Sequence, residues 1–341
     1  MHPYRLALAF ALAAALLLGL AACTRKGHRV LEVNYVSAVQ ATLRDQVATM
    51  YNRVGTVKNG ERVEVLEREK RFSRVRTATG IEGWIEQRYL VDQQTYDGLQ
   101  KLTQENLRDP VQAAGVLRND SNLHLTPGRE TEHLYQLVVG AKVSVLKRAT
   151  VEKQPGAAPA PAKSAKASSG PMLEDWWLVR DAQNRVGWVL ARMVDLDVPL
   201  DVAQYAEGQR FVAFFVLNQV EDPGKEGADK KVSQYLCVIT EPHDGLPYDF
   251  DQIRVFTWNV RKHRYETAYR EHGLNGVLPV TVTSENFDKE GVLPVFILRV
   301  KNDSGNISQR KYKMNSPIVH RVLAPGEQKE APKPAGKRRR R

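Results

Sequence analysis

One group of residues in the C-terminal third of the chain carries side chains that metal-assisted hydrolysis uses. His263, Glu266, Glu271 and His272 lie within one short stretch, and histidine with glutamate can hold a metal ion and activate water. On an extended strand Glu266 and His272 would share a face, but at about 3.3 Å per residue they would be about 20 Å apart. We therefore do not expect the two side chains to share a metal ion.

A second group of polar side chains precedes this stretch and surrounds Pro242 and Pro247. It consists of Glu241, His243, Asp244, Asp249 and Asp251. Carboxylates with a histidine can bind a divalent cation, but this spacing matches no calcium-binding loop. We expect a solvated acidic loop at this position.

The cysteines also limit the possible chemistry. Only Cys23 and Cys237 occur, which excludes a disulfide-rich scaffold and a zinc ribbon. Cys237 alternates within an apolar strand and is expected to be buried, and no serine or cysteine lies in a recognisable nucleophile elbow. We predict no catalytic residue, no metal and no cofactor, hence no enzyme, with a hydrolase site in the C-terminal domain as the alternative.

Length and charge restrict the class of protein. A chain of 341 residues with 42% hydrophobic composition is too long for one ordinary core and indicates two or three domains. The net charge is +11, but one positive charge lies in the first five residues and six lie in the last ten, leaving about +4 for the body. Because tracking of phosphates needs a basic face, we expect no nucleic-acid partner.

The N-terminus has the pattern of an export signal. A short segment with Arg5 is followed by the apolar run Leu6–Leu20 and by Ala21-Ala22-Cys23. This pattern resembles the lipobox of bacterial lipoproteins, which implies a signal peptide over 1–22, lipidation at Cys23 and a tether over 23–33. The alternatives are a plain secretory signal or a transmembrane anchor, although the run is short for spanning about 30 Å of hydrocarbon.

The resemblance to lipoproteins also implies a location. Several acyl chains hold a protein stably on a membrane leaflet, so we expect a lipid-anchored protein of the bacterial cell envelope that faces the periplasm. Thr24 follows the cysteine; aspartate at that position retains such proteins at the inner membrane, so the outer membrane is favoured.

An internal repeat organises the next part of the chain. Leu43-Arg44 and the segment 60–66 match residues 80 positions later, whereas Val75-Arg76 and Gly83-Trp84 match residues 104 positions later. The second copy therefore carries an insertion, which we place at 151–171. Its segment Gln154–Pro171 is rich in Pro, Ala, Ser, Gly and Lys, a composition typical of disordered loops.

Each copy alternates apolar and polar residues between turn signals, which predicts a small β-barrel. The Gly60–Leu66 strand, Arg74-Val75-Arg76 and Gly83-Trp84-Ile85 resemble the bacterial SH3-like (SH3b) domain, as do their counterparts in the second copy. Two barrels, over 34–93 and 116–198, are implied. Members of this family mostly bind cell-wall peptides or protein partners, and several are attached to wall hydrolases. Phe72 and His124 depart from the family pattern.

Aromatic side chains are the candidate binding surface, because flat rings give a large contact area at low entropic cost. For Trp84 and Trp188 the alternative is a place in the barrel core. We match Trp177 with Phe72 and therefore expect the adjacent Trp176 to point outward. The candidate residues are Tyr51, Trp84, Tyr89, Tyr135, Trp176 and Trp188.

A short helix is expected between the barrels, within 94–115, because Tyr96, Leu99, Leu102 and Leu107 recur at helical spacing and Asp109-Pro110 follows. Its alternative, a membrane-binding amphipathic helix, lacks a clear polar stripe.

The segment 199–323 predicts a sheet-rich domain, a sandwich or an open barrel. Ile253–Glu271 is expected to form a hairpin in which Tyr265, Thr267 and Tyr269 share a face. The run Arg264–Tyr269 resembles a segment of uncharacterised bacterial lipoproteins. The strand-like segments are Val212–Leu217, Tyr235–Ile239, Ile253–Trp258, Tyr265–Arg270, Val277–Val282, Val295–Val300 and Ile318–Val322.

These features together predict an all-β protein with two SH3-like barrels, a connecting helix, a C-terminal sheet domain and a disordered polybasic tail over 324–341. We expect a membrane-anchored envelope adaptor that binds peptidoglycan peptides or envelope proteins. A hydrolase, or a purely structural spacer of an envelope assembly complex, is the alternative.

We predict that replacing Cys23 abolishes lipid attachment. In cells fed a labelled fatty acid, the wild-type chain should become labelled and Cys23→Ser should not, because the thiol is the acceptor of the diacylglyceryl group. Equal labelling of the two chains would contradict the assignment.

Overall fold

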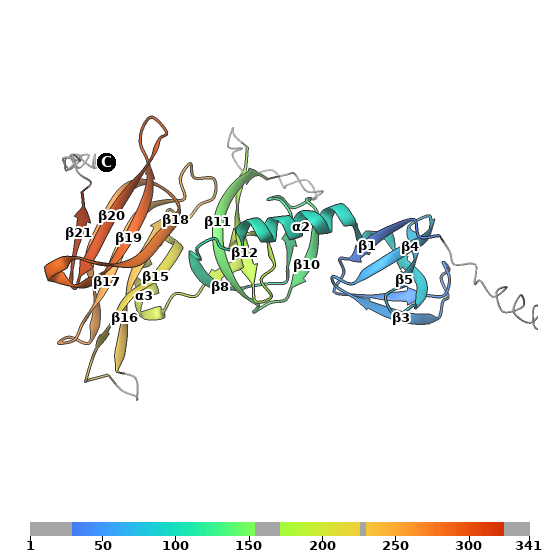
Figure 1. Ribbon diagram of the computed structural model, residues 1–341, viewed down its shortest axis with the longest axis horizontal. Helices are drawn as coiled ribbons and strands as arrows, with labels where there is room; N and C mark the ends of the chain where they lie inside the picture. Colours follow the sequence, from blue (N-terminus) through green and yellow to red (C-terminus); the bar gives the residue numbers. More distant parts are fainter. Residues whose placement is uncertain (1–28, 154–170, 226–229, 324–341) are drawn as a thin grey trace, which may run out of the picture. The chain divides into compact units, whose positions relative to one another are not determined.

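The computed structural model describes residues 29–153, 171–225 and 230–323, in two compact units that meet between Gln93 and Gln94. Three antiparallel seven-stranded sheets account for most of these residues (Figure 1), which confirms the all-β prediction. The expected signal peptide with Cys23 and the polybasic tail lie outside the described residues. In the part that is described, no helix has the length and apolar character needed to cross a membrane.

The first unit is a small barrel whose valines alternate with charged residues, so that Val63, Val65 and Val75 fill a core with Leu43 and Ile85. The strand order is β3-β2-β6-β5-β4-β1-β7. The strands are β1 (Glu32–Val36), β2 (Gln40–Arg44), β3 (Arg53–Lys58), β4 (Arg62–Glu69), β5 (Phe72–Thr77), β6 (Glu82–Glu86) and β7 (Leu90–Asp92), with the 3-10 turn η1 (Gln87–Tyr89) before the last.

A second barrel repeats this topology, with the order β10-β9-β13-β12-β11-β8-β14. The registers correspond as well: Arg44 pairs with Trp84 in the first barrel, and His124 pairs with Trp188 in the second. Its elements are β8 (Ala113–Leu117), β9 (Ser121–His124), β10 (His133–Leu137), β11 (Lys142–Glu152), β12 (Leu173–Asp181), β13 (Val186–Leu190), η2 (Ala191–Met193) and β14 (Val194–Leu196).

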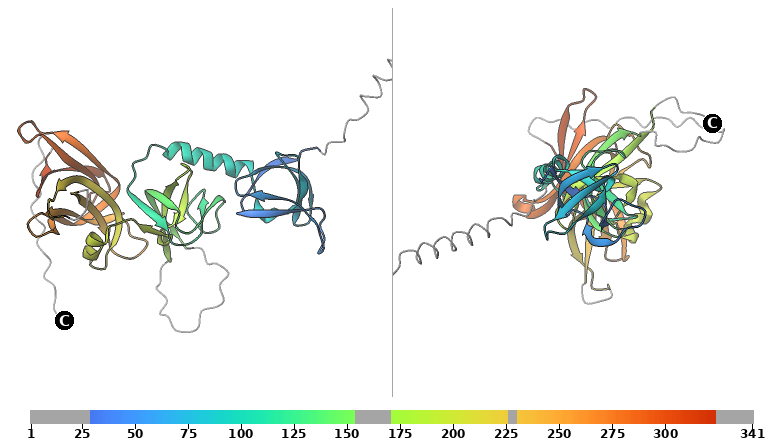
Figure 2. Two further views of the ribbon diagram at one scale, coloured as in Figure 1. Left: turned by 90° about the horizontal axis from the view of Figure 1, so that it is seen from below. Right: turned by 90° about the vertical axis from the view of Figure 1, so that its right-hand side faces the viewer.

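Helix α2 (Gln93–Asn106) lies along one side of the second barrel (Figure 2). Leu99 is fully buried, and Leu102 packs against the cluster of Leu146, Leu178 and Val186 of the barrel. The connecting helix is therefore part of the second unit.

The C-terminal sheet is a single meander in which each strand pairs with the next in sequence. It curls, so that β15 contacts the non-neighbouring β18 and β19 (Figure 2). Its two edge strands do not pair, which makes it an open barrel and not a sandwich. It follows α3 (Leu200–Ala203) and η3 (Gln204–Ala206) and consists of β15 (Arg210–Glu221), β16 (Lys231–Thr240), β17 (Phe250–Asn259), β18 (Arg264–Asn286), β19 (Val292–Lys301), β20 (Ile307–Asn315) and β21 (Ile318–Val322), with η4 (Asp288–Glu290) before β19.

Two expectations about these strands are wrong. The predicted strands Tyr265–Arg270 and Val277–Val282 form one long strand, β18, and β20 was not predicted. Tyr265 and Tyr269 lie on opposite faces, because Val255 pairs with Tyr269 and the adjacent Phe256 pairs with Thr267. The bulge at Ala268 reverses the alternation of side chains, as one extra residue in a strand must.

A buried ionic cluster joins the second barrel to the C-terminal sheet. The Asp175 carboxylate on β12 accepts hydrogen bonds from Arg148 on β11 and from Arg210 on β15, each at 2.7 Å. Arg148 also donates to Asp249 at 3.2 Å and to the carbonyl of Tyr248 at 2.7 Å. Asp175 is fully buried, so its charge needs both arginines. We call Arg148, Asp175, Arg210 and Asp249 the clasp.

Gln112 forms a second joint between the same two parts. Its side-chain amide oxygen accepts from the Val280 nitrogen at 2.7 Å, and its amide nitrogen donates to the Val280 carbonyl at 3.3 Å. Its own carbonyl accepts from the Phe214 nitrogen at 2.9 Å. Because Gln112 is completely buried, these bonds are shielded from water, and the barrel and the sheet share one core.

We predict that Asp175→Asn lowers the free energy of unfolding at neutral pH by about 3–5 kcal/mol, because it removes the buried counter-charge that Arg148 and Arg210 share. Burial alone would raise the pKa of Asp175, but the hydrogen bonds from Arg148, Thr150 and Arg210 outweigh it and hold this pKa below its usual value. The stabilisation is therefore present above about pH 4 and disappears as the pH falls through the lowered pKa.

Urea unfolding over a pH series measures this difference. The gap between wild type and Asp175→Asn should close in acid, whereas a gap that stays constant would contradict the role of the charge. Asp195→Asn is the control: its ion pair with Arg118 is exposed on both sides, so it should cost less than about 1 kcal/mol.

Candidate functional site

The outer surface of the first barrel carries a row of charged and aromatic side chains. Along β6, Ile85 points into the core, so Glu82, Trp84 and Glu86 point outward. Trp84 lies at the centre, with Arg44 and Arg74 as its cross-strand neighbours on either side. Its exposed fraction is 9%, because side chains on adjacent strands cover one another.

Carboxylates hold the arginines of this row in place. Arg74 donates to Glu82 at 3.0 Å, Arg76 lies 3.5 Å from the same carboxylate, and Arg44 lies 3.6 Å from Glu86. The side chains of these arginines remain between 23% and 32% exposed. Guanidinium groups oriented in this way can donate hydrogen bonds to carbonyl or carboxylate oxygens of a ligand.

An aromatic ring is added by the loop between β2 and β3. Asp45 accepts hydrogen bonds from the backbone and side-chain nitrogens of Asn52, both at 2.8 Å, which closes the loop. Tyr51 then lies with its ring 4.1 Å from the Arg44 guanidinium, which is also 5.1 Å from the Phe72 ring. Tyr51 is 41% exposed, so its ring is available to a ligand.

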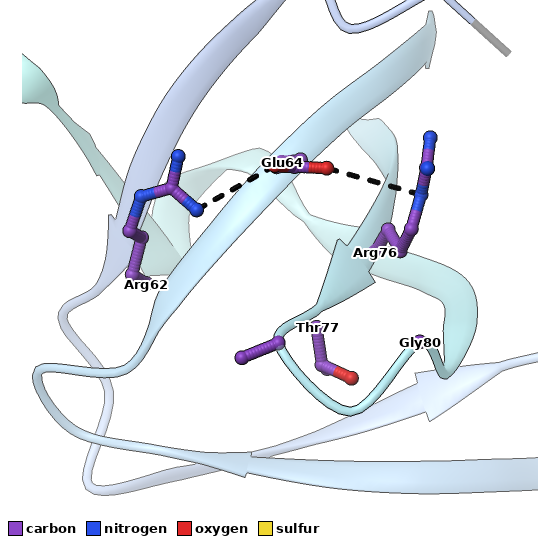
Figure 3. A pocket seen from close by; sticks show the side chains of 6 residues that line it. Arg62, Glu64, Arg76, Thr77 and Gly80 are labelled. Carbon is purple, nitrogen blue, oxygen red and sulfur yellow. Dashed lines mark ion pairs between the residues drawn. The ribbon is translucent and has the colours of Figure 1, made fainter.

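A pocket of about 320 Å³ lies at the other end of the row (Figure 3). Glu64 sits between Arg62, 3.5 Å away, and Arg76, 3.9 Å away. The pocket is lined by Arg62, Glu64, Arg76, Thr77, Ala78 and Gly80. We call it the Arg76 pocket, and we call the surface from Tyr51 and Arg44 across Trp84 and Arg74 to this pocket the arginine face.

The structure places two of the predicted site residues of this barrel, Tyr51 and Trp84, on the arginine face. Tyr89 lies in η1 and is half-buried against the core, with Arg88 4.8 Å above its ring. Trp84 does not belong to the cluster that fills the barrel, but at 9% exposure it is itself buried, in line with the alternative of a place among the buried residues.

In the second barrel one predicted residue, Trp176, is buried, and Tyr135 and Trp188 are half-buried. Trp176 was expected to point outward, but it is 2% exposed and packs edge-on against His124, with ring centroids 5.2 Å apart. The error lies in the match with the first barrel: Val145 pairs with Val179 as Val65 pairs with Val75, which makes Trp176 the counterpart of Phe72. Burial, and then the neighbouring His133, lower the pKa of His124 to about 4, so it is neutral at pH 7.

The other two predicted residues of the second barrel lie on the side that α2 covers. Tyr135 accepts a hydrogen bond from Gln100 of the helix at 3.2 Å, and Trp188 packs, as Leu102 of the helix does, against the cluster of Leu146, Leu178 and Val186. Both rings are half-buried, so α2 restricts access to this surface.

The polar groups of the C-terminal domain do not converge on a reactive centre. His263 contacts Asp222 at 2.8 Å, Glu266 accepts from Asn259 and Lys262, and Glu271 accepts from Tyr269 and Tyr312. The acidic loop is not simply solvated, because Asp244 pairs with Arg210 and Asp249 with Arg148. Among the described residues no group of three or more suitable side chains could hold a metal ion.

Cys237 is buried, as expected. Burial raises the pKa of its thiol far above the usual range, so the sulfur stays protonated at neutral pH. It therefore packs as a small apolar side chain.

Comparison with known proteins identifies one domain. Residues 40–91 match the family model of the bacterial SH3 domain. The chain thus contains a bacterial SH3 domain, and the arginine face lies within it or at its edge. No curated protein is found to match the chain.

Solved structures similar to the chain include two proteins of Trichomonas vaginalis and one of Bacillus cereus. NlpC2 and NlpC1 from Trichomonas vaginalis are each 10% identical, with TM-scores of 0.17 and 0.18, and the matches cover 85% and 83% of this chain and 95% and 89% of theirs. An NlpC/P60 family protein from Bacillus cereus is 10% identical, with a TM-score of 0.23, and the match covers 84% of this chain and 95% of that one.

These matches contradict the prediction that the chain is not an enzyme, because all three structures bear NlpC or NlpC/P60 names. We withdraw that prediction. With TM-scores far below 0.5, the matches themselves assign no reaction to this chain.

The arginines and glutamates of the arginine face are not among the residues predicted from the sequence. The sequence pattern that indicates them is a charged residue at alternate positions of two strands: Arg74 and Arg76 on one strand, and Glu82 and Glu86 on the next. At the matching positions of the second barrel, Leu178, Val186 and Leu190 are apolar, a contrast that the repeat alignment already contained.

We predict that the charges of the arginine face are not required for folding. Arg74→Leu combined with Glu82→Val should change the free energy of unfolding by less than about 1.5 kcal/mol, because the second barrel carries Leu178 and Val186 at these positions. Ile85→Ala, which empties the core, should cost about 2–5 kcal/mol. Urea unfolding of the full chain measures both, and equal losses would contradict the distinction.

Proposed function

We propose that this chain is a lipid-anchored protein of the bacterial cell envelope that binds cell-wall peptides through the arginine face of its first barrel. The observation that carries the proposal is that this face combines oriented, partly exposed guanidinium groups with an exposed tyrosine ring. The bacterial SH3 match over residues 40–91 supports a cell-wall role.

The chemistry of the face suits a peptide. Arg44, Arg74 and Arg76 are partly exposed donors, and peptides supply carbonyl and carboxylate acceptors along their length. Tyr51 offers a flat apolar surface beside them. We also infer that the second barrel is a divergent copy of the same domain, since it has the same strand order and register.

The leader supports the anchored location. Lipid on Cys23 would hold the mature chain on a leaflet, outer membrane favoured, with the barrels in the periplasm within reach of peptidoglycan. The polybasic tail would add a salt-sensitive contact with anionic lipids or wall polymers. Envelope proteins are the second class of partner, and nucleic acid is not among them.

The experiment is a pull-down with purified peptidoglycan sacculi freed of attached polymers, using a chain that starts after Cys23. Wild type should sediment with the sacculi. Arg74→Leu with Glu82→Val should bind at least about tenfold more weakly, because charge-assisted hydrogen bonds of about 1.5–3 kcal/mol are lost. This double change leaves the net charge unchanged, so weaker binding cannot be a general charge effect.

Lys58→Ala is the matched control, because Lys58 is exposed at the end of β3 and is not part of the arginine face; it should bind like wild type. Failure of the wild-type chain to bind would overturn the proposal. The same incubation tests the hydrolase alternative, since cleavage would release soluble wall fragments into the supernatant.

A further inference from the structure

The two barrels differ most on one surface. When the strand registers of the two barrels are aligned, Arg74 corresponds to Leu178, Glu82 to Val186 and Glu86 to Leu190. Three charged positions of the arginine face are thus apolar in the second barrel, where Leu178 and Val186 are completely shielded from water. The barrel fold itself does not dictate either choice, since both barrels have the same register.

Helix α2 covers the apolar version of this surface. Leu102 packs against the cluster of Leu146, Leu178 and Val186. The fit at Gly98 is close: a Cβ added there would lie 3.0 Å from a methyl group of Leu125. The helix therefore approaches the barrel with its backbone, as a bound peptide would.

Polar groups of the barrel also bind α2. The backbone nitrogen of Val186 donates to Thr103 at 3.1 Å, and Lys147 donates to Asn106 at 2.6 Å. Tyr135 accepts from Gln100. The residue that matches Tyr135 in the first barrel is Gly55. A Cβ added to Gly55 would lie only 3.0 Å from Ile81, so the first barrel has no room for a tyrosine at this position. The tyrosine that binds the helix is thus particular to the second barrel.

One contact of α2 has a direct counterpart in the first barrel. Arg180 donates to the carbonyl oxygen of Leu107, just after the end of the helix. Arg180 pairs with Ser144 and Val186 as Arg76 pairs with Glu64 and Glu82. The arginine that holds a peptide carbonyl in the second barrel is therefore the arginine that lines the Arg76 pocket in the first (Figure 3).

We propose that α2 occupies the ligand face of the second barrel in place of a ligand, which leaves the first barrel as the open one. The carbonyl of Leu107 on Arg180 then marks the corresponding subsite of the first barrel: its peptide ligand places a carbonyl or carboxylate oxygen on Arg76. This second statement rests on the function proposed above, whereas the first concerns the second barrel alone.

A disulfide across the contact between α2 and the barrel tests the first statement. In Gly98→Cys with Leu125→Cys, the new thiols should join on mild oxidation of the chain that starts after Cys23, because the Gly98 Cβ position lies against the Leu125 side chain. Native Cys237 is buried and should not compete. The oxidised and reduced forms should bind purified sacculi equally. Absence of the disulfide, or binding that falls at least about twofold on oxidation, would overturn the statement.

Arg76→Gln and Arg76→Lys test the subsite on the same sacculi. Arg76→Gln should bind about tenfold more weakly and Arg76→Lys should recover part of the loss, because a lysine keeps a charged donor but not the planar fork. Arg180→Gln is the matched control and should leave binding unchanged. If wild type binds and Arg76→Gln binds equally well, the subsite is wrong while the proposed function stands. If wild type does not bind, the proposed function fails.

Discussion

The carboxylate of Asp175 is the group on which the architecture of the second unit depends. It lies on a barrel strand, without contact with water, and receives hydrogen bonds from an arginine of its own barrel and from an arginine of the C-terminal sheet. Removing either arginine would leave the buried Asp175 charge incompletely paired in a low-dielectric surrounding, which costs several kcal/mol. The clasp and the shared core therefore make the second barrel and the C-terminal sheet one body.

The packing of the second barrel against the C-terminal sheet explains how two barrels with the same topology can differ in which surfaces they expose. The second barrel contributes one surface to the C-terminal sheet and another to α2, and its apolar residues at the helix contact suit a permanent partner. The first barrel has charged residues at the matching positions. Charged side chains at a partly exposed surface suit a ligand that binds reversibly. The difference lies in a few outward positions, not in the fold.

Much of this arrangement could be predicted from the sequence, because local patterns determined it. The offsets of 80 and 104 located both barrels, and alternating valines gave their inward faces. One error lies where the alternation of side chains is interrupted: the bulge at Ala268 places Tyr265 and Tyr269 on opposite faces. The other comes from an incorrect match of Trp177 with Phe72, which led to the wrong prediction that Trp176 points outward. Strand β20 was not predicted because only Tyr312 and Met314 are buried in it, and the charged residues Arg310, Lys311 and Lys313 around them mask the alternating pattern.

The candidate site was less predictable, for a physical reason. Aromatic residues were sought because rings give contact area, yet none of the five tryptophans is exposed: Trp84, Trp176 and Trp177 are buried, and Trp188 and Trp258 are half-buried. Whether a ring is open depends on what covers it, and α2 and the clasp are contacts between distant segments that no local pattern reveals.

If α2 covers the ligand face of the second barrel, only the first barrel can bind cell-wall fragments. The most direct measurement is a titration of the indole N–H signals of the full chain, labelled with nitrogen-15 at tryptophan, with soluble fragments of digested sacculi. We expect the Trp84 signal to shift with added fragments and the signals of Trp176 and Trp188 to stay fixed. Shifts of Trp188 or Trp176 with an unmoved Trp84 would contradict this expectation.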